Sequence, residues 1–193
     1  MYNDVLEKIT EDYFKSKGYF TFHNVPYSLS TQHVSDIDVM GINPLKKENS
    51  KIIVVSCKSW DGGLDLKKIL KLAKNPPKER IRSGLYRPER FKEIIYLEWI
   101  QALKAEVEKL TGEKTFTFYF SAVKFTHEEL KEEFVSFCKT KLIGCEVKLL
   151  PFKQIVDKIQ NDILENKSTR PLESEIGRII QLIHYSGGTI SYH

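Results

Sequence analysis

Two short apolar segments constrain the fold of this chain more than any other feature of its sequence. Residues 37–42 (IDVMGI) and 52–57 (IIVVSC) flank a turn-rich connection that contains Asn43, Pro44, Asn49 and Ser50. Two such segments joined by turn-forming residues predict a pair of adjacent strands, a β-hairpin. The second segment is apolar on both faces, which is typical of a central strand covered on both sides. We therefore expect this hairpin to lie in a sheet with layers packed on both faces.

Charged side chains stand at one end of both predicted strands. Because side chains alternate between the faces of a strand, Asp36 and Asp38 share one face of the first, and Ser56 and Lys58 share one face of the second. Lys58 closes the apolar segment, so it is expected at the rim of a covered sheet rather than on an open face. A buried charge without a partner costs roughly several kcal/mol. Asp38 is the expected partner of Lys58, with Cys57 turned into the core.

These residues resemble the PD-(D/E)xK nuclease superfamily, and within it the Mrr-like branch. That family has a Glu on a helix, an Asp after a short hydrophobic run, and (D/E)-x-Lys at the end of the next strand. Asp38 in SDIDVMGI, Lys58 in VVSCKSW and Glu7 in VLEKITEDYFKSKGY match those positions. Ser56 stands where the family usually has Asp or Glu. The resemblance covers about residues 2–60 and implies a restriction-endonuclease-like fold.

The resemblance also implies an activity, the metal-dependent hydrolysis of phosphodiester bonds in nucleic acid. It implies a Mg²⁺ or Mn²⁺ ion held by Asp38, by the backbone carbonyl of Cys57 and by Glu7, which suits the preference of Mg²⁺ for few protein oxygens. Lys58 would orient the attacking water and balance charge in the transition state, while the metal lowers the pKa of that water. Many nucleases of the superfamily act as dimers, so a homodimer is expected on the same ground.

Ser56 leaves this predicted site one negative charge short, and three interpretations stay open. In the first, Glu7, Glu11 or Asp36 compensates, and the protein is an active endonuclease. In the second, Ser56 reaches the ion through a water molecule. In the third, the site is inactive and the protein keeps the nuclease fold only to bind nucleic acid. Glu7 and Glu11 lie on the polar side of the predicted helix 2–17, which normally faces water.

The distribution of charge favours nucleic acid as the partner; of the two kinds, we expect DNA rather than RNA. The chain carries a net charge of +4, but residues 64–92 hold ten basic and three acidic side chains, a local charge of +7. Such a basic segment beside the nuclease-like pattern suits binding to a phosphate backbone. The candidate nucleic-acid-binding residues are Lys67, Lys71, Lys74, Arg80, Arg82, Arg87 and Trp60, the last as a platform for a base.

The remaining segments alternate between strand and helix patterns and predict an α/β domain, with a mixed sheet of about five strands and helices on both faces. The expected strands after residue 58 are 115–125 and 145–150. The expected helices are 2–17, 64–74, a long helix over 88–112, a helix opened by a capping box at Thr126 and Glu129, a helix from 151 to 166, and a last one over 172–185. We assign residues 1–165 to the domain and 166–193 to a linker and helical extension.

The same sequence disfavours several other classes of protein. It contains no apolar run near the ~20 residues that span a bilayer and no secretory signal pattern, so a cytoplasmic protein is expected. Three cysteines without a CxxC pair argue against disulfides and zinc. The patterns GxxxxGK[ST] and GxGxxG are missing, which disfavours nucleotide hydrolysis and dinucleotide binding.

Overall fold

The computed structural model describes residues 4–76, 90–166 and 175–187, which form an α/β fold around one mixed sheet. The sheet has five strands in the order β1-β2-β3-β5-β7. Their bounds are β1 Phe20–Ser30, β2 His33–Ile42, β3 Ile52–Lys58, β5 Thr117–Ala122 and β7 Glu146–Pro151. The first three pair antiparallel, and β3, β5 and β7 pair parallel. The predicted five-stranded mixed sheet is confirmed, and so is the hairpin of β2 and β3.

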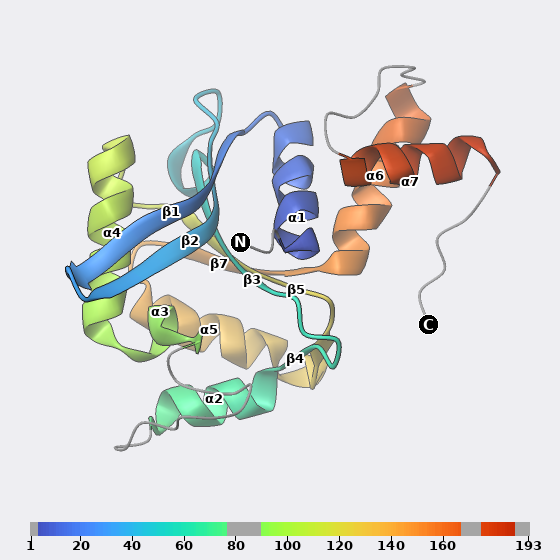
Figure 1. The fold of residues 1–193 in the computed structure, drawn as a ribbon. Helices are drawn as coiled ribbons and strands as arrows, with labels where there is room; N and C mark the ends of the chain where they lie inside the picture. The colour runs from blue at the N-terminus through green and yellow to red at the C-terminus, as the bar shows by residue number, and fades with distance from the viewer. Residues whose placement is uncertain (1–3, 77–89, 167–174, 188–193) are drawn as a thin grey trace.

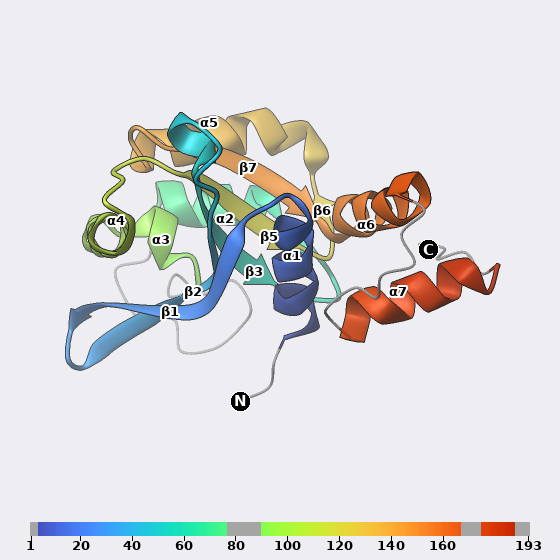
Figure 2. The same ribbon diagram turned by 90° about the horizontal axis from the view of Figure 1, so that it is seen from above.

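Helices cover both faces of this sheet, as Figures 1 and 2 show. Helices α1 (Val5–Ser16), α6 (Phe152–Asn166) and α7 (Glu175–Tyr185) lie on one side, and α2 (Leu66–Lys74), α3 (Lys92–Ile95) and α5 (Lys131–Lys141) lie on the other. Helix α4 (Leu97–Thr111) packs against β1. A second, two-stranded sheet joins β4 (Leu64–Asp65) to β6 (Phe125–Thr126).

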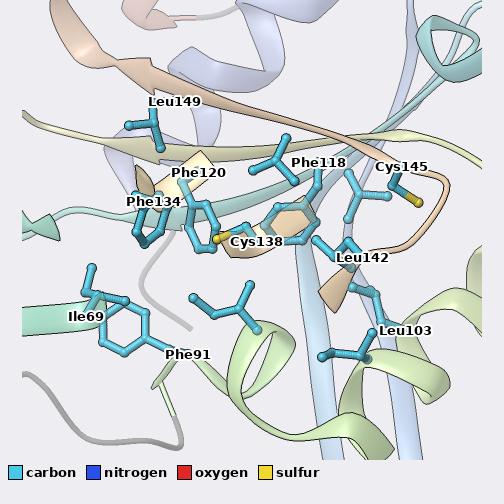
Figure 3. Packing of buried hydrophobic residues seen from close by; sticks show 14 of the residues in the cluster. Ile69, Phe91, Leu103, Phe118, Phe120, Phe134, Cys138, Leu142, Cys145 and Leu149 are labelled. Carbon is cyan, nitrogen blue, oxygen red and sulfur yellow. The ribbon is translucent and has the colours of Figure 1, made fainter. Parts of the chain in front are cut away.

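Strand β3 contributes side chains to both layers of the core, because alternate residues belong to different hydrophobic clusters. Ile52 and Val54 join the larger cluster, which contains Phe118, Phe120 and Phe134 (Figure 3). Ile53, Val55 and Cys57 join the smaller cluster under α1 and α6. The burial of this strand on both faces confirms the reading of segment 52–57 as a central strand, and the position of Cys57 confirms that its side chain faces the core.

Helix α1 has a clear start that fixes its first turn beside the sheet. The side chain of Asp4 accepts a hydrogen bond from the backbone N–H of Leu6 at 2.8 Å, which satisfies one of the unpaired donors of the first turn. The helix buries Leu6, Ile9 and Phe14 against the sheet. Its polar side is therefore held at a defined position next to the ends of β2 and β3.

Three sequence predictions about elements are wrong in detail. The long helix expected over 88–112 is interrupted at Tyr96, whose extended backbone separates α3 from α4, and Pro88 lies outside the described residues. The strand expected over 115–125 is divided between β5 and β6. No capping box forms at Thr126, because His127 adopts a left-handed backbone (φ 59°) and a 3₁₀ turn precedes α5.

Among its described side chains, the last helix buries Ile180 and Gln181. Ile180 of α7 joins the cluster that α1 and α6 form, whereas Ile179, Leu182 and Tyr185 are exposed. None of the helices in the described part of the chain combines the length and the apolar character needed to cross a bilayer.

Candidate active site

A cleft opens where β2 and β3 stop pairing with each other. Their ladder ends at the pair Val39 and Val55; before Val39, β2 pairs only with β1, and after Val55, β3 pairs only with β5. The cleft has a volume of about 340 Å³ and lies between the two strands where they diverge. The residues that line it are Asp4, Tyr27, Ser35, Asp36, Ile37, Asp38, Val54, Val55, Ser56, Cys57, Lys58, Ser59, Trp60, Arg90, Lys92, Glu93, Leu103 and Phe118. The structure therefore brings Asp38, Ser56 and Lys58 to one cleft, as alternation along the two strands predicts.

Asp38 spans the gap between the two strands. Its Oδ2 accepts a hydrogen bond from the backbone N–H of Cys57 at 2.5 Å, just where the β2 to β3 ladder has ended. Burial raises the pKa of Asp38 to about 6, although Lys58 and the Cys57 hydrogen bond both favour the charged form. A nearby cation would stabilise the charged form of a carboxylate that is this poorly solvated.

Lys58 stands at the end of β3 inside a network of polar groups. Its Nζ donates to Ser56 Oγ at 2.7 Å and lies 3.9 Å from Glu93 Oε1. Burial alone would lower the pKa of Lys58, but Glu93 and Asp38 outweigh it, so the pKa is raised above its ordinary value. The ammonium is therefore charged at neutral pH, although it is largely shielded from water.

Glu93 is the functional candidate that the sequence analysis missed. It belongs to the short helix α3, its side chain is only 8% exposed, and its Oε1 accepts a hydrogen bond from Ser56 Oγ at 3.0 Å. The negative charge that Ser56 lacks is thus supplied beside it by a residue 37 positions later in the chain. Nothing local marks Glu93 in the sequence, because it lies within one apparently continuous helical pattern.

The helical glutamates behave differently from each other. Glu7 lies near the cleft, where burial and the charges of Asp38, Asp4 and Asp36 raise its pKa to about 7. Glu11 is turned toward β1, and its carboxylate accepts from Thr21 Oγ1 at 2.9 Å and pairs with Lys15 and His23. The idea that Glu11 substitutes for Glu7 is therefore wrong.

The candidate nucleic-acid-binding residues that the structure describes lie on α2 and at the cleft. Lys67 and Lys71 are exposed on α2, and Lys74 is exposed but pairs with Glu133 at 2.6 Å. Arg80, Arg82 and Arg87 lie outside the described residues. Trp60 lines the cleft, yet its ring is contacted by the Arg90 guanidinium at 5.3 Å and by the edge-on ring of Phe91 at 5.7 Å. A base would therefore have to displace Arg90 to stack on that face of Trp60.

The donor set of the cleft fits a hard divalent cation held by few protein ligands. Asp38 and Glu93 offer carboxylate oxygens from β2 and α3, and burial, with a smaller contribution from neighbouring carboxylates, raises the pKa values of Asp38 and Glu7. Mg²⁺ usually takes one or two carboxylates and completes its shell with water and phosphate oxygens. Among the described residues no three His, Cys, Asp or Glu side chains cluster closely enough to enclose an ion by themselves.

No protein-family model, curated protein or solved structure matches this chain.

Proposed function

We propose that this cleft hydrolyses phosphodiester bonds of nucleic acid, with DNA favoured over RNA, with the help of a bound Mg²⁺ or Mn²⁺ ion. The observation that carries the proposal is the network in which Ser56 Oγ accepts from Lys58 and donates to Glu93, next to Asp38. It supplies two carboxylates and a charged lysine in one cleft. Those are the groups that the resemblance to the PD-(D/E)xK superfamily calls for, with Glu93 in place of the carboxylate missing at Ser56.

Each side chain has a definite task in this proposal. Asp38 and Glu93 would hold the metal, together with the backbone carbonyl of Cys57 that the resemblance implies. The bound ion supplies Lewis acidity and a lowered pKa for an attacking water. Lys58 carries its charge at the cleft, where it stabilises the negative charge that develops on the phosphate. Ser56 holds Glu93 and Lys58 in register through its two hydrogen bonds.

A second candidate, a nucleic-acid-binding protein that has lost catalysis, is favoured by one observation. Glu93 already has a partner in Lys58, at 3.9 Å, so its charge is balanced without a metal ion. Under this alternative, the protein binds nucleic acid and cleaves none. Both candidates bind nucleic acid, and only the first cleaves it when a metal ion is added.

Cleavage of single- and double-stranded DNA and RNA with Mg²⁺ or Mn²⁺ decides between them. Wild type should cleave at least one of these substrates, and Asp38→Asn, Glu93→Gln and Lys58→Met should each lose cleavage while retaining the fold. Asp61→Asn is the matched control, because Asp61 is an exposed carboxylate outside the residues that line the cleft. Binding without any cleavage by wild type would support the binding protein and refute catalysis.

The homodimer and the cytoplasmic location stay predictions. Size-exclusion chromatography with light scattering tests the first of them directly. The proposed chemistry requires neither, because every side chain that it uses comes from a single chain.

A further inference from the structure

Two cations line the cleft beside the proposed catalytic residues, and each rests against an indole ring. The guanidinium carbon of Arg90 lies 5.3 Å from the ring centroid of Trp60. The Nζ of Lys92 lies 4.1 Å from the ring centroid of Trp99. Both cations are half-buried. The cleft thus has a cationic wall that the catalytic network does not use.

The contacts with indole rings fix these cations without using up their hydrogen-bond donors. A cation over an aromatic face is held by the ring quadrupole, at a distance of up to about 6 Å. The five N–H groups of a guanidinium and the three of an ammonium still need oxygen acceptors. The N–H groups of a guanidinium also form a fork that matches two oxygens of a phosphate. Trp60 and Trp99 therefore position the charged groups of Arg90 and Lys92.

The positive side chains of the cleft come from two segments of the chain, so a ligand there could contact more than one of them. Lys58, Arg90 and Lys92 all line the same cleft. Carboxylates line it as well (Asp4, Asp36, Asp38 and Glu93), so a phosphate contact there depends on the positions of the cations and not on the total charge.

We propose that Arg90 and Lys92, positioned by Trp60 and Trp99, bind a backbone phosphate next to the phosphate that is cleaved. The proposal rests on the proposed function, since it takes the ligand to be nucleic acid. It assigns Trp60 a positioning role instead of the base-stacking role expected from the sequence. The cleft of about 340 Å³ has the size of pockets that hold one small ligand, so it suits a single nucleotide unit of a strand.

The test measures binding of a fluorescent single-stranded oligonucleotide in EDTA, so that cleavage does not enter. Arg90→Gln and Lys92→Gln should each weaken binding about tenfold, as the loss of a hydrogen bond to a charged group does. Each should also reduce the slope of log affinity against log salt concentration by about 0.7, the value for one phosphate contact on a single strand. Lys114→Gln makes the same charge change on a lysine that is 78% exposed and lies outside the cleft lining, so it should leave both quantities near wild type.

Substitutions of Trp60 separate positioning from packing. Trp60→Phe keeps an aromatic face for Arg90 and should retain most of the affinity, whereas Trp60→Leu should behave like Arg90→Gln. If the two Trp60 variants bind equally well at equal thermal stability, the positioning role is refuted. If Arg90→Gln and Lys92→Gln match Lys114→Gln in affinity and salt slope, the phosphate subsite is refuted.

Failure of this subsite is distinguishable from failure of the proposed function. Cleavage in Mg²⁺ by wild type, and its loss in Asp38→Asn, test catalysis without reference to Arg90 or Lys92. A protein that cleaves but shows no dependence on the two cations would lose only the subsite. A protein that binds through them but never cleaves would keep the subsite and lose catalysis.

Discussion

Asp38→Asn separates the electrostatic state of the cleft from its hydrogen bonding, and it gives the sharpest test of the site. Asparagine keeps an oxygen that can accept from the backbone N–H of Cys57, so the 2.5 Å bridge between β2 and β3 can persist. The charge is lost, and an NH₂ group replaces the second carboxylate oxygen. A change in the pH dependence of stability therefore reports the ionisation of Asp38 together with its effect on Glu7, whose pKa the Asp38 charge helps to raise.

The magnitude follows from the pKa of Asp38, which burial lifts from 3.8 to about 6. The folded state holds this proton more tightly than the unfolded chain, so the group's contribution to stability is full below about pH 4 and is lost as the pH rises through 6. At about 1.4 kcal/mol per pKa unit, the loss amounts to at most about 3 kcal/mol, because water at the cleft mouth screens part of the effect. Relative to wild type, Asp38→Asn should therefore gain up to that amount of stability between pH 4 and pH 7.

Urea denaturation followed by circular dichroism, in EDTA and from pH 4 to pH 8, measures this difference. Asp61→Asn controls for the loss of an exposed carboxylate. At pH 7, Mg²⁺ at 100 times its dissociation constant should add about 2.7 kcal/mol to wild type and little to Asp38→Asn. If the free energy of unfolding changes with pH in the same way for wild type and Asp38→Asn, then burial does not destabilise the charged form of Asp38. Equal stabilisation of both by Mg²⁺ would refute Asp38 as a metal ligand.

Three further predictions concern the surroundings of the cleft. Ser56→Glu should cost about 3 kcal/mol at pH 7 in urea denaturation and should not improve cleavage, because it forces a second buried carboxylate against Glu93. Glu7→Gln should remove a loss of stability that wild type shows as the pH rises from about 4.5 through 7, because the Glu7 pKa is raised to about 7. Gly63→Ala should destabilise the fold by about 1–3 kcal/mol and should weaken oligonucleotide binding, because Gly63 has φ +77° and an added Cβ would lie 2.7 Å from the carbonyl oxygen of Lys124. Gly62→Ala is its control, since an added Cβ there meets no atom within 4 Å, and equal stability of the two variants would contradict the reasoning.

The part of the site that lies on neighbouring strands could be predicted from the sequence. Alternation within β2 and β3 is a local property, so the shared cleft of Asp38, Ser56 and Lys58 follows from reading each strand with a period of two. The apolar run of β3 likewise predicts its central place in the sheet. These inferences hold because each depends on residues within a few positions of one another.

The part of the site that comes from the helical layer could not be predicted in this way. Glu93 contacts Ser56 from the short helix α3, which the extended backbone of Tyr96 separates from α4. The periodic pattern of apolar residues continues across that break, so periodicity alone predicts one long helix. The orientation of Glu11 could not be predicted for a related reason. Glu7 and Glu11 are one turn apart on α1, but Glu11 is buried against Thr21 of β1 while Glu7 stays near the cleft.

The position of Glu93 has a physical consequence for the proposed catalysis. A carboxylate at position 56 would be fixed by the sheet, because its backbone pairs with Phe120 of β5. Glu93 is instead carried by a four-residue helix, next to Arg90 and Lys92, which line the same cleft. A nucleic-acid strand that binds these two cations would therefore act on the segment that also positions the second carboxylate. Substrate binding and metal binding should then strengthen each other. In the control variant Asp61→Asn, the affinity for Mg²⁺ should rise when an oligonucleotide is bound. In Glu93→Gln, a bound oligonucleotide should leave the affinity for Mg²⁺ unchanged.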